Sequence, residues 1–248
     1  MSDAFEIARV GMGAQDRALN VLAANIANVN TPSFKCIDAS FSAMVMADMQ
    51  TGAMHTAGVR MDATPSFTVQ GEMQATNNPL DLAIDGEGFI ELLGPGGEVH
   101  LWRGGRLAIS PDGSLMTAEG QMLRAAISVP FDATTLSIAD DGLVTAMTAQ
   151  GDPLELGAIE LVRVTSPSAL EPVSGSTLKV LDASMVRSSP AGEEGAGRLR
   201  QGMIERSNVD LNDEMVSLMI LQRAYAANAQ VLQVADQVIS ITNNLRQR

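Results

Sequence analysis

Cysteine and histidine are the scarcest reactive residues of this sequence. Its 248 residues include one cysteine, Cys36, and two histidines, His55 and His100. A single cysteine excludes an internal disulfide, and these three side chains are too few for a persuasive zinc site. No nucleophile-elbow, Walker, dinucleotide-binding or H-E-x-x-H pattern is present. We therefore expect no enzyme, no bound metal and no cofactor.

Aromatic and basic residues are also scarce. Aromatic residues make up 3% of the chain, so stacking platforms for bases or sugars are few. There are 16 Lys and Arg residues against 29 Asp and Glu residues, a formal net charge of −13. This balance disfavours a protein that grips a phosphate backbone, and we expect no nucleic-acid partner.

Long apolar runs are absent as well. No stretch of about 18 residues is apolar and uncharged, which excludes a transmembrane helix and predicts no membrane insertion. The first twenty residues carry acids and arginines every few positions, unlike a secretory signal with its basic start and apolar centre. We expect a soluble chain, or one that leaves the cytoplasm by a route that needs no cleaved signal.

Charge and hydrophobic period divide the chain into four segments. Residues 1–40 and 203–248 each carry a net charge of −1, whereas residues 41–202 carry −11. We predict an N-terminal helix with a short motif over 1–40, a connecting segment over 41–70, a central β domain over 71–202 and a C-terminal helix over 203–248.

The C-terminal segment has a sustained heptad pattern. Apolar residues alternate at spacings of four and three, at Ile220, Ala224, Ala227, Val231, Val234, Val238, Ile241 and Leu245. A second, mostly apolar row runs beside it, at Leu218, Leu221, Tyr225, Asn228, Leu232, Ala235, Ile239 and Thr242. With Ser207, Asn208 or Asp210 as its N-cap, a helix is predicted over about 210–245.

The N-terminal segment repeats this pattern. The row consists of Phe5, Ala8, Met12, Gln15, Leu19, Leu22, Ile26 and Val29. Pro32 disfavours helical geometry at the residue before it, so a helix is predicted over about 3–29. A second row of mostly small side chains runs beside it, at Ala4, Ile7, Gly11, Ala14, Ala18 and Val21. The chain's own domain could cover the two rows on each helix. They nevertheless need more neighbours than two helices supply, so we favour lateral association between copies.

Short alternating runs separated by glycine turns fill the middle of the chain and predict an antiparallel β domain. The expected fold class is α+β, with long N- and C-terminal helices that form a coiled-coil layer and a central antiparallel β domain. Residues 188–197 show no periodicity and predict a mobile loop. The acids Asp81, Asp85, Glu87 and Glu91 superficially resemble a calcium loop, but their strand-like alternation favours a hairpin. A calcium-dependent binding module or an unrecognised hydrolase stays as the alternative.

Three strings resemble signatures of the bacterial flagellar rod and hook proteins. They are residues 19–35 (LNVLAANIANVNTPSFK), residues 78–89 (NPLDLAIDGEGF), and residues 205–210 with 222–228 (ERSNVD and QRAYAAN). They follow the family order, and the last pair is similar to the ending of the distal-rod members. A proximal-rod or hook-type member is the alternative. The family has glycine where this chain has Ser33, and a turn with positive φ would be mildly strained by serine.

The resemblance implies a non-enzymatic axial subunit of the flagellar basal body, located in the periplasmic rod. Such a subunit is exported by the flagellar type III apparatus without a Sec signal and polymerises into a tube that transmits torque. Its terminal helices would form the inner coiled-coil layer, with the β domain outside. Its partners would be further copies of itself, other rod subunits, the hook protein, the surrounding ring proteins and the export apparatus.

The helical rows and the motifs together predict a polymerisation interface on the two terminal segments. Its members are Phe5, Met12, Leu19, Leu22, Asn25, Ile26, Asn28, Val29, Ile220, Ala224, Tyr225, Ala227, Val231, Val234, Val238, Ile241 and Leu245.

Overall fold

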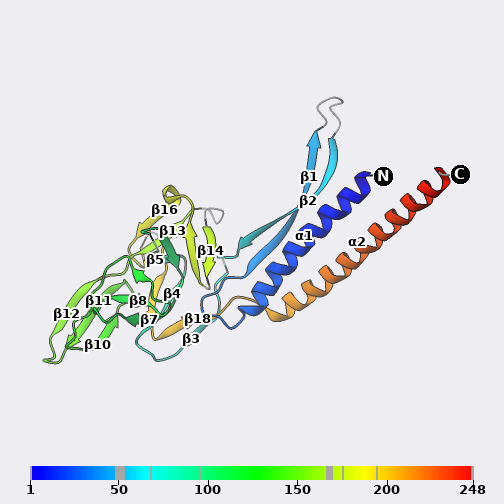
Figure 1. Cartoon of the computed structure of the whole chain (residues 1–248). Coiled ribbons are helices and arrows are strands. Elements are labelled where there is room, and N and C mark those ends of the chain that lie inside the picture. Colours follow the sequence, from blue (N-terminus) through cyan, green and yellow to red (C-terminus); the bar gives the residue numbers. More distant parts are fainter. Residues whose placement is uncertain are drawn as a thin grey trace. The chain divides into compact units, whose positions relative to one another are not determined.

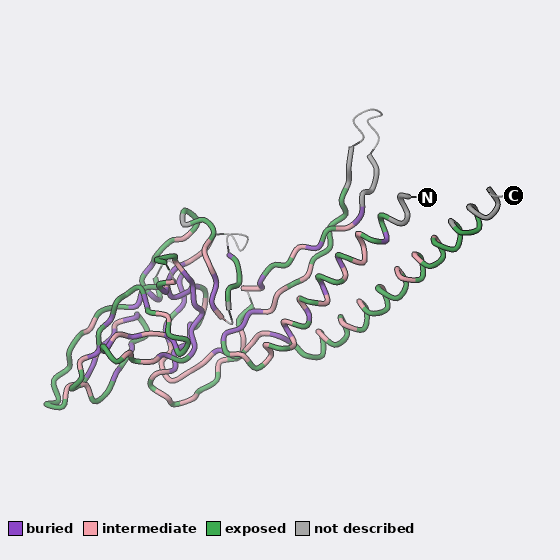
Figure 2. The backbone as a smooth tube through the Cα atoms, in the orientation of Figure 1, coloured by how far each residue is buried: buried purple, intermediate pink, exposed green. Residues whose placement is uncertain are grey.

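The structure is a computed structural model that describes residues 2–47, 54–67, 69–94, 96–165, 170–174, 176–193 and 195–246. The chain forms two units (Figures 1 and 2). The helical unit comprises Met1–Ala27, Ile37–Pro65 and Asp210–Arg248, and the β unit comprises Asn28–Cys36 and Ser66–Val209.

The helical unit contains helix α1 (Ser2–Ala27), helix α2 (Leu211–Arg246) and a hairpin of strands β1 (Ile37–Ala47) and β2 (Met54–Pro65). Both helices lie where the heptad rows predict them. Helix α1 contacts α2 and the hairpin (Figure 1). Neither helix, over its described residues, combines the length and the hydropathy needed to cross a bilayer.

Asp210 is the N-cap of α2. Its carboxylate accepts the backbone N–H of Asn212 at 2.8 Å and that of Asp213 at 3.4 Å. These contacts satisfy donors that the first turn of a helix otherwise leaves unpaired. Asp213 and Glu214 in the same turn lie at the positive end of the helix dipole.

The β1–β2 hairpin lies largely where sequence analysis predicted only a connecting segment, over residues 41–70. Its first strand is rich in alanine, serine and methionine, and such residues carry little β propensity. Packing against α1 provides the stability that the low β propensity does not. Met61 of β2 is buried in a cluster with Ala14 and Ala18 of α1. Gly58 lies close to α1, since a Cβ there would come 2.7 Å from Val10.

The β unit is antiparallel throughout its described strands, as predicted. Its largest sheet follows the order β14 (Leu170–Ser174), β15 (Thr177–Val180), β6 (Val99–Trp102), β5 (Phe89–Leu93), β9 (Met122–Leu123), β8 (Leu115–Thr117), β7 (Gly104–Ile109), β4 (Asp81–Asp85) and β17 (Arg198–Gln201). Strand β13 (Leu161–Val164) pairs with β5 and with β16 (Val186–Ser189), which follows the 3-10 turn η2 (Ala183–Met185). Smaller sheets join β10 (Ala133–Ile138), β11 (Leu143–Thr148) and β12 (Pro153–Ala158), and join β18 (Met203–Glu205) to β3 (Met73–Ala75).

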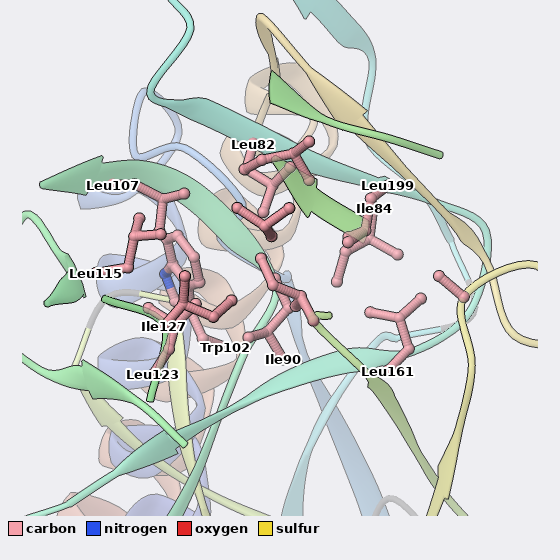
Figure 3. Packing of buried hydrophobic residues seen from close by; sticks show 14 of the residues in the cluster. Leu82, Ile84, Ile90, Trp102, Leu107, Leu115, Leu123, Ile127, Leu161 and Leu199 are labelled. Atoms are coloured by element: carbon pink, nitrogen blue, oxygen red, sulfur yellow. The ribbon is translucent and has the colours of Figure 1, made fainter. Parts of the chain in front are cut away.

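Aliphatic side chains form the core of the β unit around one tryptophan. Trp102 is 2% exposed and belongs to a cluster with Leu82, Ile90, Leu107 and Leu161 (Figure 3). Glycine permits the tight turns between the surrounding strands. At Gly142 φ is +93°, and a Cβ would lie 2.3 Å from the carbonyl oxygen of Ile159.

Residues 188–197 are anchored over their described positions, so the prediction of a mobile loop is wrong there. Ala191 and Ala196 are buried in the main core cluster. The N–H of Gly197 donates to the carbonyl oxygen of Glu87 at 2.6 Å. The composition did indicate turns, but its small side chains also allow the segment to pack against the core.

Candidate functional site

Helix α2 presents its two apolar rows to different surroundings. The row that includes Leu221 and Asn228 faces α1. Leu221 packs against the cluster of Ala14 and Ala18, and the Asn228 side chain donates to the Gln15 side chain at 3.1 Å. A partly buried polar pair of this kind favours one register between two helices.

The other row of α2 is uncovered. Ile220, Val231, Val234, Val238 and Ile241 are between 40% and 61% exposed, and we call this row the α2 face. Ala227 is exposed and Ala224 is half-buried, whereas the side chain of Leu245 lies outside the described residues. Figure 2 shows no buried residue along the described length of α2. Exposed apolar stretches of this kind mark interaction sites in stable proteins.

The predicted N-terminal residues lie deeper in the structure. Met12, Leu19, Ile26 and Val29 are half-buried, as is Asn28, and Leu22 is buried. The side chain of Phe5 lies outside the described residues. Tyr225 of α2 is 36% exposed, at the edge of the row that faces α1.

Asn25, also predicted in the interface, is 1% exposed and forms bonds within the helical unit. Its side-chain amide donates to the Ile37 carbonyl oxygen and to the Glu214 carboxylate, each at 2.9 Å. Its side-chain oxygen accepts the Ile37 N–H at 2.9 Å. Asn25 therefore joins the end of α1 to the start of β1 and to the first turn of α2.

A buried charge cluster in the β unit was not predicted. The Lys35 ammonium lies 2.6 Å from one carboxylate oxygen of Glu205, and Nε of Arg103 lies 3.3 Å from the other. All three side chains are at most 5% exposed. Burial lowers the pKa of Lys35 and of Arg103, although the hydrogen bond and the charge of Glu205 oppose this in both.

The cluster ties together backbone from distant parts of the β unit. Lys35 also donates to the Val69 carbonyl oxygen at 2.9 Å, and the Gly71 N–H donates to Glu205 at 2.7 Å. Arg103 donates to the carbonyl oxygens of Gly86 and Gly88. The only sequence signal for the cluster was that Lys35 ends one family string and Glu205 begins another.

Ser33 adopts the left-handed conformation that the family's glycine suggested. Its φ is 58°, and its N–H donates to the Glu205 carbonyl oxygen at 2.8 Å. The side chain is 1% exposed, and its hydroxyl oxygen has no hydrogen-bond partner among the described residues.

The Asn208 side chain, three residues after Glu205, forms hydrogen bonds with Cys36, Ser66 and Val69. Its side-chain oxygen accepts the Cys36 N–H at 2.6 Å. Its amide donates to the carbonyl oxygens of Ser66, at 3.2 Å, and Val69, at 2.9 Å. Asn208 of the third family string therefore holds Cys36, the residue after the first string, against Ser66 and Val69 within the β unit.

The four acids considered for calcium are separated into individual ion pairs. Each of them pairs with a different arginine: Asp81 with Arg106, Asp85 with Arg200, Glu87 with Arg163, and Glu91 with Arg124. Arg200 also pairs with Asp140 at 2.8 Å. In the described part of the chain, no group of three or more acidic, histidine or cysteine side chains is arranged to hold a metal ion. The arrangement supports a structural role for these acids.

Three family models match the chain in the order of its three strings. "Flagella basal body rod protein" matches residues 5–35, "Flagellar hook protein FlgE/F/G D1 domain" matches residues 83–146, and "Flagellar basal body rod FlgEFG protein C-terminal" matches residues 200–245. The fold and these matches define a flagellar axial protein.

Individual relatives narrow this class. The chain is 33% identical over 266 residues to the flagellar basal-body rod protein FlgG of Borreliella burgdorferi, with 100% of both chains covered. It is also 33% identical to FlgG of Caulobacter vibrioides, over 98% of this chain and 99% of the relative. The flagellar hook protein FlgE of Rhizobium meliloti is 32% identical over 70% of this chain and 43% of its own length. The chain therefore belongs to the flagellar basal-body rod protein family.

Proposed function

We propose that this chain is a structural, non-enzymatic subunit of the distal flagellar rod. Its support is the similarity to proteins named FlgG over the whole of both chains, whereas the hook protein is matched over less than half of its length. Its place is the basal-body rod, and its partners include further copies of itself, other rod subunits and the hook protein. Ring proteins and the type III export apparatus complete the proposed partners.

The single observation that carries an assembly role is the uncovered α2 face. A polar helix surface is stable in water without a further neighbour. A row of valine and isoleucine side chains is stabilised when another surface covers it, because burial of apolar area lowers the free energy. Between Met215 and Ile241 the helix carries only two charged residues, Arg223 and Asp236. This surface suits the apolar seam of a helix from another copy.

In this proposal the terminal helices of neighbouring copies form an inner coiled-coil layer, with the β units outside. The row that faces α1 joins the two helices within one subunit. The α2 face then joins one subunit to the next. These two separate contacts explain why α2 carries two apolar rows.

A charge placed in the α2 face tests this role. Val234 is 57% exposed, so aspartate there leaves the free subunit folded. On assembly the charge would be desolvated without a partner, at a cost of several kcal/mol. We expect Val234→Asp to abolish rod assembly and swimming in a strain that lacks its own copy of the gene.

Gln233→Asp is the matched control, because Gln233 is exposed on the adjacent polar face of the same helix. It introduces the same charge and a loss of helix propensity at least as large as that of Val234→Asp, and we expect normal rods. Wild-type swimming with Val234→Asp would remove the α2 face from the proposal.

A further inference from the structure

One phenylalanine of the β unit is almost fully in water. Phe131 is 88% exposed, in a turn closed by a hydrogen bond from the Ala133 N–H to the Pro130 carbonyl oxygen at 3.1 Å. The next residue, Asp132, accepts the Ala149 N–H on its carbonyl oxygen at 3.1 Å. The ring is therefore held outward by a fixed backbone, an arrangement that reduces the entropy lost on binding.

The same unit contains a pocket of about 670 Å³ that is lined by both apolar and charged side chains. Phe67 and Phe89 meet edge to face there, with ring centroids 5.3 Å apart. Val164 and Leu170 complete the apolar lining. A pocket of this size and character accommodates an aromatic side chain together with its neighbours.

Two arginines lie opposite each other at the rim of this pocket. Arg163 of β13 and Arg187 of β16 are direct cross-strand partners. Like charges in this position destabilise a sheet unless an anion compensates them. Glu87 pairs with Arg163 at 3.0 Å, whereas the Arg187 side chain forms no ion pair or hydrogen bond within the described part of the chain. The rim therefore retains a positive charge suited to a carboxylate.

We propose that Phe131 of one copy inserts into this pocket on the next copy, with the Asp132 carboxylate beside Arg187. This rests on the proposed function, since it describes a second contact of the same polymer. Strand β10, which follows Asp132, lies away from β13, β14 and β16 in Figure 1, so one β unit does not fill its own pocket. Such a contact joins two different surfaces head to tail, which generates an open helical filament where the rotation between copies does not close into a ring.

Sedimentation of the purified full chain over a range of concentrations tests the contact. We expect Phe131→Ala and Arg187→Glu each to weaken self-association at least about tenfold, as for central interface residues. Both positions are exposed, so Phe131→Ala should leave the melting temperature unchanged. Arg187→Glu should not lower it, because glutamate replaces a like charge opposite Arg163 by an opposite one. Ile109→Ala and Arg198→Glu are matched controls at exposed positions outside the pocket, and they should assemble like the wild type. Asp132→Lys should restore assembly to Arg187→Glu.

A photo-crosslinker separates this contact from the α2 face. Benzoylphenylalanine at position 131 should form adducts between copies at residues 67, 89, 164 or 170. Adducts at other places, or full assembly of Phe131→Ala, would overturn the contact and leave the distal-rod assignment intact. A wild-type chain that never self-associates would overturn both.

Discussion

Lys35 and Glu205 lie 170 positions apart in the sequence, and their charged atoms meet at 2.6 Å in the interior of the β unit. Arg103 adds a second cation to the same carboxylate. One buried carboxylate thus joins the end of the first family string to the start of the third. This relationship makes Glu205 the central member of the cluster.

The first prediction concerns how much Glu205 and Lys35 each contribute to the free energy of unfolding. Glu205→Gln leaves two buried cations without a carboxylate, and we expect it to lower the free energy of unfolding by about 3–5 kcal/mol. Lys35→Met leaves the Arg103–Glu205 pair intact and removes a costly buried charge, so we expect a loss below about 2 kcal/mol. Urea denaturation measures both. An equal loss in the two variants would contradict the central role of Glu205.

The second prediction concerns Ser33. Glycine has no penalty at a φ of 58°, and its introduction also removes the buried hydroxyl that has no described partner. We expect Ser33→Gly to raise the free energy of unfolding by about 1 kcal/mol. Ser33→Ala keeps the backbone strain and removes only the hydroxyl, so its melting temperature should lie between the other two. A destabilised glycine variant would show that the turn is not strained.

The third prediction concerns pH. Burial alone raises the pKa of the Asp81 carboxyl, but hydrogen bonds from Arg106 and Asn78 and the charge of Arg106 outweigh it and lower the pKa below its usual value. Asp81 therefore stabilises the fold above its unfolded pKa of about 4, and this stabilisation is lost as the pH falls through the lower, folded pKa.

Asp81→Asn is the matching variant for this pH dependence. Its unfolding free energy should lie below that of the wild type at pH 6, and the difference should shrink as the pH falls below about 4. Chemical denaturation between pH 2 and 7 gives both curves. A difference that stays constant over this range would show that the Asp81 charge does not stabilise the fold.

The fourth prediction concerns salt. The β unit contains 19 acidic and 10 basic residues, a net charge of −9, and the α2 face is apolar. Salt screens repulsion between like-charged β units but does not screen hydrophobic association. We expect assembly to proceed more readily at about 0.5 M than at about 0.05 M NaCl, measured by light scattering.

Neutralising unpaired surface acids provides the control for the salt effect. Asp112 and Glu119 are exposed and form no ion pair within the described residues, so Asp112→Asn with Glu119→Gln should reduce the dependence on salt. Assembly that declines steadily with salt in both proteins would indicate that ion pairs hold the polymer together.

The sequence predicts the helices better than it predicts the site. Both helices are placed correctly because their signals are local. These signals are the long heptad rows, Pro32 after the first helix and the cap Asp210 before the second. The β1–β2 hairpin escapes prediction because only its packing on α1 makes an alanine- and serine-rich strand stable. The pairing of Lys35 with Glu205 escapes for a related reason, since no local pattern shows which buried charges meet across 170 positions.

The uncovered α2 face also implies that the free energy of unfolding of this chain depends on its concentration. In the proposed assembly, the valine and isoleucine side chains of the α2 face are buried in the folded chain but not in the unfolded one, so the folded state is stabilised as the concentration of its partners rises. Each tenfold increase in subunit concentration above the dissociation constant adds about 1.4 kcal/mol. A free subunit is therefore the most vulnerable form of the molecule, and its durability is a property of the polymer that it joins.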